Sequence, residues 1–434
     1  EYIVKTINGA SLLETGNPDL QKYSASLVIP DNLEMNVRVD GVDYIDFENV
    51  NIAPSKGNIS RLINPNSIQY SRNDIYTSDE FFPGKLADLN DPYILRDLRG
   101  QAVNVYPFQY NPESKILRVY TEITVTVFSV GQSNTNIINR SQAISSIDKD
   151  FNNVYLTHFE NYEHTQTRFE YLDEIGNLLI ISYGGFIDAM QPLVDWKRKK
   201  GIPTEIVDVA SIGSNSTAIE TYVDDYYHNQ GLTFLLLVGD IAQIPSPEIS
   251  GAKSDPSYGF IDGNDYYSEI IVGRFSANTP SDVTTQVERT INYERFPSDG
   301  VWYNAAGSFG SNQGPGWGGL TDDQFLETAI WPLLDDYTYG QHTSIYDPNS
   351  SVSNGVEAIN SGLSIINYTG HGYQDGWGNG APLNSSDVNG LVNTDKLPFV
   401  ITVGCNVGEF DYSTTVFTEA WLKATHDGQP TGAI

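Results

Sequence analysis

The sequence predicts a multidomain protein in which an N-terminal all-β sandwich precedes an α/β domain with a mainly parallel sheet flanked by helices. Two observations support this fold class. Up to about residue 135, short runs of alternating apolar and polar residues are separated by turn residues, which is typical of half-buried antiparallel strands. From about residue 177, fully apolar runs alternate with amphipathic segments, as in parallel strands covered by helices. The 434 residues are enough for the separate cores that this arrangement needs.

The N-terminal alternation is clearest in the runs at 24–29, 35–39, 101–106 and 117–127. β-branched residues are frequent in these runs and favour strands. We therefore expect a sandwich to about residue 130. Residues 131–140 are polar and rich in Asn, which indicates a linker, and a helical pattern follows near 145–160.

The second region alternates strands and helices in chain order. The predicted strands are the apolar runs at 178–182, 204–207, 233–240, 270–273, 303–309, 363–368 and 399–403. The predicted helices lie at about 217–229, 281–294, 322–334 and 416–427. The tail at 431–434 has the character of the opening of another strand.

Two reactive side chains follow two of these apolar runs. His371 stands between two glycines just after the run at 363–368, and Cys405, the only cysteine, follows the run at 399–403. The carboxyl ends of parallel strands share one edge of a sheet, where ligands bind. A thiol and an imidazole at that edge form a nucleophile and its base. The alternatives are a buried structural cysteine and a histidine in an ordinary turn.

The charge balance excludes some classes of partner. The chain has 24 Lys and Arg against 55 Asp and Glu, a net charge of −31. Such an acidic surface repels nucleic acids and anionic membranes. No apolar run is long enough to span a membrane. A single cysteine excludes an internal disulfide, which fits either the cytosol or bacterial export, and the start at Glu1 has the character of a trimmed chain without a signal peptide.

Two groups of carboxylates are candidate binding residues. Asp262, Asp265 and Glu269 surround a tight turn, and such oxygens suit Ca²⁺, although an ordinary Asp-Gly hairpin turn explains them equally well. Asp322 and Asp323 open a predicted helix. One carboxylate there is most simply an N-cap, and the alternative is a carboxylate that faces a cleft and binds a cationic substrate side chain.

Several motifs resemble those of the gingipains, secreted bacterial cysteine endopeptidases with a caspase-like fold. The stretches Asn-Tyr-Thr-Gly-His-Gly at 367–372 and Gly-Cys-Asn-Val-Gly-Glu-Phe at 404–410 resemble the family's His and Cys motifs. Resemblance to the arginine-specific branch of the family is found at residues 236–240, 253–255, 263–276 and 427–432. Resemblance to the family's propeptide is found at residues 52–57, 81–84 and 95–101. The resemblance covers essentially the whole chain. It implies a propeptide at 1–168 and a caspase-like peptidase domain at 169–434 that is incomplete at its C-terminal end.

The resemblance also implies roles for single residues. Asp323, or Asp322 if the alignment moves by one, falls at the base of the pocket for the substrate side chain. Lys85 falls where the family places a basic inhibitory residue of the prodomain. The activating cleavage is expected between Arg168 and Phe169, although without the resemblance a single arginine at this position would not indicate a cleavage site. Structural calcium is implied at Asp262, Asp265, Tyr267 (through its carbonyl) and Glu269.

One departure concerns the residue that orients the catalytic histidine. The family has an acidic residue just after the strand near 303–309, whereas residues 305–321 contain no carboxylate. Asn312 is the nearest equivalent, and an asparagine orients the histidine in papain-like enzymes.

The resulting hypothesis is a zymogen of a secreted or cell-surface cysteine endopeptidase. It would cleave protein or peptide substrates after Arg, with Lys left open, and its own prodomain would keep it latent. No nucleic acid and no membrane span are expected. One alternative is a secretion-system transpeptidase of the same fold, and the other is an inactive, calcium-stabilised binding module.

Overall fold

The computed structural model describes residues 2, 4, 9–59, 63–140, 144, 146–162, 170–172, 176–314, 316 and 319–434. Of these, the residues of Glu1–Asp173, Asp262–Tyr267 and Trp317–Gly319 form one compact unit, and those of Glu174–Ile261, Ser268–Gly316 and Leu320–Ile434 form a second. The predicted boundary between Arg168 and Phe169 lies outside the described residues.

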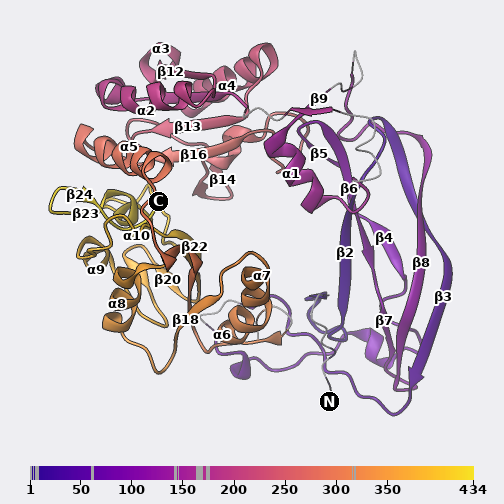
Figure 1. Ribbon diagram of the computed structural model, residues 1–434. Coiled ribbons are helices and arrows are strands. Elements are labelled where there is room, and N and C mark those ends of the chain that lie inside the picture. The colour runs from indigo at the N-terminus through magenta and orange to yellow at the C-terminus, as the bar shows by residue number, and fades with distance from the viewer. Residues whose placement is uncertain are drawn as a thin grey trace. The chain divides into compact units, whose positions relative to one another are not determined.

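The first unit contains two antiparallel sheets up to residue 132, which confirms the antiparallel strands (Figure 1). One has the order β1 (Ala10–Ser11), β2 (Gln21–Val28), β6 (Leu98–Val105) and β4 (Ala87–Leu89), with β5 (Tyr93–Leu95) also on β6. The other has the order β3 (Leu33–Phe47), β8 (Ile116–Gln132) and β7 (Phe108–Asn111). That these sheets form the two layers of a sandwich stays a prediction.

A helix and short elements complete the first unit. α1 (Lys149–His158) lies within the predicted helical stretch, and β9 (Ser146–Asp148) pairs in parallel with β10 (Glu170–Leu172). Two 3₁₀ helices, η1 (Pro65–Ser67) and η2 (Asp74–Thr77), lie in the loop before β4. One face of α1 is buried in a hydrophobic cluster made of Tyr93, Leu95, Leu98, Ile147, Phe151, Tyr155, Phe159 and Tyr162.

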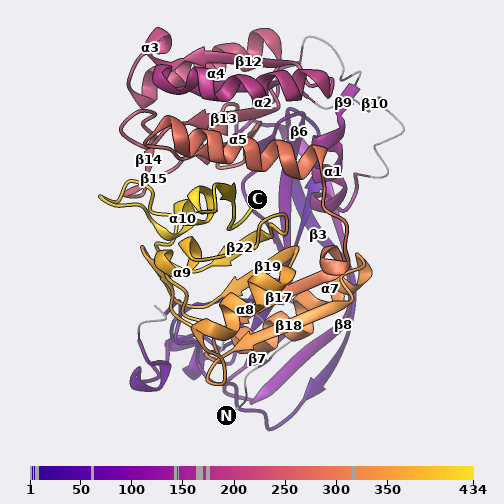
Figure 2. The ribbon, with the colours of Figure 1, turned by 60° about the vertical axis from the view of Figure 1, so that its left-hand side comes forward.

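The first sheet of the second unit is parallel and covered on both faces. Its order is β12 (Thr204–Asp208), β11 (Leu178–Ser182), β13 (Phe234–Val238) and β16 (Ile271–Phe275). Leu179 and Ile181 of β11 pack with α4 (Ser216–Gln230). Ile180, between them, packs on the opposite side with α2 (Ile187–Lys199) and α5 (Pro280–Arg295), which lie side by side (Figure 2). This alternation follows from the two-residue period of a strand.

The second unit has two parallel sheets, so the prediction of one sheet was wrong in this respect. The second sheet has the order β18 (Gln341–Tyr346), β17 (Ala305–Gly310), β19 (Ile365–Thr369) and β22 (Phe399–Val403). After α5 the chain passes through η6 (Val301–Asn304) into β17. β17 pairs with β18 on one side and β19 on the other, so it has no free edge with which to extend the first sheet.

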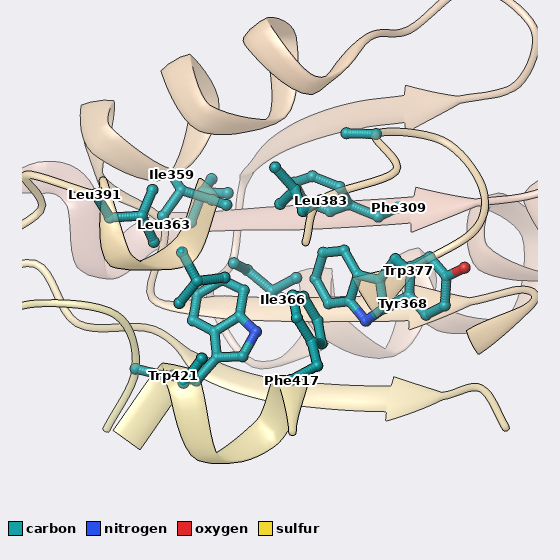
Figure 3. Close-up of a cluster of buried hydrophobic side chains, with 14 of the residues drawn as sticks. Phe309, Ile359, Leu363, Ile366, Tyr368, Trp377, Leu383, Leu391, Phe417 and Trp421 are labelled. Carbon is teal, nitrogen blue, oxygen red and sulfur yellow. The ribbon is translucent and has the colours of Figure 1, made fainter. Parts of the chain in front are cut away.

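Helices also flank the second sheet. α8 (Val352–Gly362), α9 (Ser385–Asn389) and α10 (Phe417–Lys423) contribute to one core, in which the rings of Tyr368, Trp377, Phe417 and Trp421 meet (Figure 3). The predicted helix at 322–334 is a continuous stretch of α6 (Asp322–Phe325), a π-helical turn (Leu326–Ile330) and α7 (Trp331–Asp336). Trp331 of α7 donates from Nε1 to Ser308 Oγ of β17 at 2.8 Å.

The predicted C-terminal helix and final strand differ from the structure. α10 ends at Lys423, and the chain then forms a hairpin of β23 (Thr425–His426) and β24 (Gln429–Pro430). The extended backbone of Ala424 ends the helix, and Asp427 and Gly428, with φ of 49° and 74°, have the left-handed conformation that suits the tight turn of the hairpin. Residues 431–434 form no strand.

A buried arginine connects elements that belong to the two sheets of the second unit. Arg289 of α5 is 2% exposed and donates to the carbonyl oxygens of Leu422, Ala424 and Thr431. Burial lowers the pKa of Arg289 to about 10, so the guanidinium is still charged at neutral pH. Nearby, Ser276 donates its hydroxyl to the buried carboxylate of Glu419.

Candidate active site

His371 and Cys405 follow two paired strands at the same register. Thr369 of β19 is paired with Val403 of β22, and each reactive residue comes two positions later. A Cβ atom on Gly372 would lie 2.4 Å from the carbonyl oxygen of Cys405. The two backbones therefore approach so closely that only glycine fits, and the predicted meeting of the two motifs at one sheet edge is observed.

The loop that carries Cys405 is exposed where the thiol stands and anchored just beyond it. Cys405 is exposed, and Asn406 has a φ of 58°, a left-handed conformation that asparagine tolerates. Val407 is buried in the core of the second sheet. The exposed thiol disfavours the alternative of a buried structural cysteine.

The backbone of His371 is held at both of its polar groups. Its N–H donates to Asn379 Oδ1 at 2.8 Å, and Asn379 Nδ2 donates in turn to Asp347 Oδ2 at 2.7 Å. Its carbonyl oxygen accepts the hydroxyl of Tyr368. Burial raises the pKa of Tyr368, so this phenol stays protonated and able to donate.

Among the described residues, the imidazole ring has one hydrogen-bonding partner, which the sequence did not predict. His371 Nε2 lies 2.9 Å from Oε1 of Gln313. With the amide oxygen as acceptor, Nε2 is the ring nitrogen that donates in this hydrogen bond, and Nδ1 takes no part in it. The predicted Asn312 is exposed and precedes this residue. Gly310 of β17 is paired with Thr369 of β19, so the residues that follow these two strands lie at the same edge of the sheet. A correct prediction of this pairing would have placed Gln313 near His371.

Asp322 and Asp323 lie beside the Gln313 loop but differ in accessibility. Asp322 is 3% exposed and accepts the Ser311 hydroxyl, while its N–H donates to the Gln313 carbonyl at 3.0 Å. Asp323 is half-buried, and its Oδ1 accepts the Gln324 N–H at 2.9 Å and the Thr321 hydroxyl. Within the described part of the chain, Asp323 Oδ2 has no hydrogen-bonding partner. That either carboxylate binds a substrate cation stays a prediction.

The predicted propeptide residues are placed in part. Lys85 Nζ forms an ion pair with Asp88 in the first unit and lies 6.0 Å from the centre of the Tyr106 ring. Its inhibitory role stays a prediction. Arg168 and Phe169 lie outside the described residues.

Two of the predicted calcium ligands, Asp265 and Glu269, accept hydrogen bonds from N–H groups of the protein. Both oxygens of Asp265 accept hydrogen bonds from N–H groups. Glu269 is fully buried and accepts the Ile261 N–H at 2.8 Å. Asp262 and Tyr267 belong with Asp265 to the first unit, whereas Glu269 belongs to the second. Among the described residues, no group of three or more His, Cys, Asp or Glu is arranged to hold a metal ion, and calcium binding stays a prediction.

A second unpredicted contact joins the loop after His371 to the loop after Cys405. Gln374 lies between β20 (Gly372–Tyr373) and β21 (Gly376–Trp377), and its Nε2 donates to Glu409 Oε2 at 2.9 Å. Its carbonyl oxygen accepts the N–H of Phe417 at 2.7 Å. The loop after His371 is thus tied to the loop after Cys405 and to the start of α10.

The sequence of the chain matches two family profiles and several known proteins. The sequence profile of Peptidase family C25 matches residues 171–434, and that of Propeptide_C25 matches residues 3–159. Gingipain R2 of Porphyromonas gingivalis is 39% identical over 432 residues, which are 98% of this chain and 58% of the relative. The chain therefore spans somewhat more than half the length of that relative.

Solved structures give the same result. The crystal structure of the Arg-specific cysteine proteinase gingipain R matches with a TM-score of 0.58 and 37% identity, over 59% of this chain and 61% of the other. A complex of the Porphyromonas gingivalis RgpB pro- and mature domains matches with the same TM-score and identity, over 59% and 62%. In the described residues, no helix is long and apolar enough to cross a membrane.

Proposed function

Because the chain belongs to peptidase family C25 and carries the propeptide of that family, we propose that it is the latent precursor of a cysteine endopeptidase that cleaves after arginine. The observation that carries the proposal is the register of β19 and β22, which brings His371 and Cys405 to one sheet edge. Arginine specificity is supported by the identity to an arginine-specific relative. Secretion and latency through the prodomain belong to the same proposal.

The proposed chemistry is built on the hydrogen bond between the imidazole and Gln313. When Nε2 of His371 donates to Gln313, Nδ1 is the nitrogen that accepts the Cys405 proton. The thiolate then attacks the carbonyl carbon of the substrate. The N–H of Cys405 and one near Gly372 would bind the oxyanion. The imidazolium returns its proton to the leaving amine, and water then hydrolyses the acyl-enzyme with His371 again as base.

The direct test follows mass and activity together. The purified protein is incubated with a trace of an Arg-specific protease, and its mass and its hydrolysis of Arg-P1 and Lys-P1 fluorogenic peptides are recorded over time, with the trace protease alone as blank. We expect a cut after Arg168 and a rise in Arg-P1 hydrolysis that exceeds the rise on Lys-P1. A clean cut without hydrolysis of either peptide would overturn the proposed peptidase activity.

We propose that Gln313 is a positioning residue for His371. Gln313→Ala should lower kcat about 3- to 10-fold, the worth of one hydrogen bond, with little change in KM, because the ring loses its fixed orientation. Gln313→Glu should restore or exceed the original kcat, since a carboxylate also stabilises the imidazolium. The measurement is steady-state hydrolysis of an Arg-P1 peptide.

Asn312→Ala is the matched control for Gln313, because it removes an amide from the neighbouring exposed position. It should leave kcat within about twofold of the parent. If Asn312→Ala lowered kcat as much as Gln313→Ala did, the loop as a whole and not the Gln313 amide would be responsible.

A further inference from the structure

Among the described residues, no carboxylate is hydrogen-bonded to the ring of His371. The partner of the imidazole is the neutral amide of Gln313, and residues 305–321, where the resemblance places an acidic residue, contain no carboxylate. We propose that Asp347, acting through Asn379, is the acidic positioning residue of His371. The inference rests on the proposed function in one respect, because it takes His371 to become an imidazolium during catalysis.

Asp347 stands at the end of a neighbouring strand of the same sheet. It directly follows β18, and its N–H donates at 3.2 Å to the carbonyl oxygen of Gly310, the last residue of β17. Its Oδ1 accepts the N–H of Gly380 at 2.9 Å, and its Oδ2 accepts Nδ2 of Asn379 at 2.7 Å. The backbone and both carboxylate oxygens are thus held, so the fold fixes the position of this charge.

Asn379 connects the carboxylate to the histidine. Its side chain is buried, and its Oδ1 accepts the backbone N–H of His371 at 2.8 Å. A Cβ atom on Gly370 would lie 2.9 Å from this oxygen, so a larger residue before His371 would push the amide away. Successive hydrogen bonds polarise and strengthen one another. The charge of Asp347 therefore strengthens the bond between Asn379 and His371.

The same charge acts on a second group that holds His371. The hydroxyl of Tyr368 donates to the carbonyl oxygen of His371. Burial raises the pKa of Tyr368, and the charges of Asp347 and Asp322 act in the same direction. Asp347 thus lies within electrostatic reach of the residues around the imidazole. A negative charge there stabilises the imidazolium that forms when His371 takes the proton of Cys405.

The first test measures the protonation of His371 and needs no hydrolysis. The full chain carries Cys405→Ala and isotopically labelled histidines, and the NMR signal of His371 is the one that is absent from His371→Ala. Titration then gives the pKa of His371. Asp347→Asn should lower this pKa, because the loss of a nearby negative charge favours the neutral ring. If the parent enzyme hydrolyses no peptide, the proposed function fails, and this titration still decides the inference.

Exchanging the two side chains gives the sharpest comparison. In the double variant Asp347→Asn, Asn379→Asp, the amide at position 347 donates to the carboxylate at position 379, which still accepts the N–H of His371. The charge then lies one residue closer to His371 along this path, so the pKa of His371 should rise above that of the parent. Asn379→Asp alone places two carboxylates face to face and should break the contact. A role in stability alone does not predict this order of pKa values.

Hydrolysis of an Arg-P1 peptide by the processed enzyme gives a second readout. Asp347→Asn should lower kcat about 10-fold, the effect of losing a hydrogen bond to a charged group, with little change in KM. The double exchange should restore most of the lost activity. Asp336→Asn, at an exposed carboxylate of α7, is the matched control and should change neither kcat nor the pKa of His371. The inference is overturned if Asp347→Asn and the double variant, shown to be folded by thermal unfolding, give the same His371 pKa as the control.

Discussion

Replacing Cys405 by alanine is expected to abolish peptide hydrolysis and self-processing while leaving the fold intact. Removal of a nucleophile from a coupled catalytic pair lowers kcat by roughly 10³-fold or more. The Cys405 side chain is exposed, so its truncation leaves no cavity and should change the melting temperature little. The measurements are hydrolysis of an Arg-P1 peptide, the mass of the protein after long incubation, and thermal unfolding.

His371→Ala serves as the partner variant for Cys405→Ala. Residues that act as a unit are strongly non-additive, so the double variant should be about as inactive as either single variant. Continued cutting after Arg168 by pure Cys405→Ala would show that an external protease makes this cut. If the double variant were less active than either single variant by the product of their separate losses, the two residues would not act in a shared step.

Replacing Asp323 by asparagine is expected to lower kcat/KM for Arg-P1 peptides about 10²- to 10³-fold. Loss of one partner from a desolvated charge pair costs about 2–5 kcal/mol in binding. The half-buried Asp323 has an oxygen without a hydrogen-bonding partner among the described residues, and asparagine keeps the size of the side chain while it removes the charge. The measurement is kcat/KM on matched Arg-P1 and neutral-P1 peptides, and only the first should fall.

Asp322→Asn is the matched control at the neighbouring position. Asp322 is buried and accepts the Ser311 hydroxyl, so its replacement should lower the free energy of unfolding by about 1–3 kcal/mol. Its effect on the Arg-P1 preference should be smaller than that of Asp323→Asn. The opposite ranking would assign the specificity role to Asp322.

The sequence predicts the residues whose positions follow from strand ends. Cys405 and His371 were predicted because each follows an apolar run, and parallel strands bring such ends together without any knowledge of side-chain contacts. The resemblance to the gingipains is confirmed by the matches to both family profiles. The antiparallel first region and the strand–helix alternation of the second were predicted from the same kind of local pattern.

Contacts between distant or adjacent polar residues were not predictable in this way. Asn312 and Gln313 carry the same amide, and only the conformation of the loop, set in part by the Asp322–Ser311 and Asp322–Gln313 contacts, decides which one reaches His371. The membership of Asp262–Tyr267 in the first unit depends on residues more than 120 positions earlier. The split into two sheets depends on the pairing of β17 with a strand on each side, and the hydrophobic periodicity of a single segment does not indicate which strands it pairs with.

The buried guanidinium of Arg289 has a consequence for how the second unit unfolds. Its α5 helix covers the first sheet, and the three carbonyl oxygens that it binds belong to the chain after β22. If one sheet opened alone, Arg289 would exchange these carbonyl oxygens for water, and each hydrogen bond to a charged group that is lost in this way costs about 1.5–3 kcal/mol. This contact therefore couples the opening of one sheet to that of the other, and we expect it to disfavour partial unfolding.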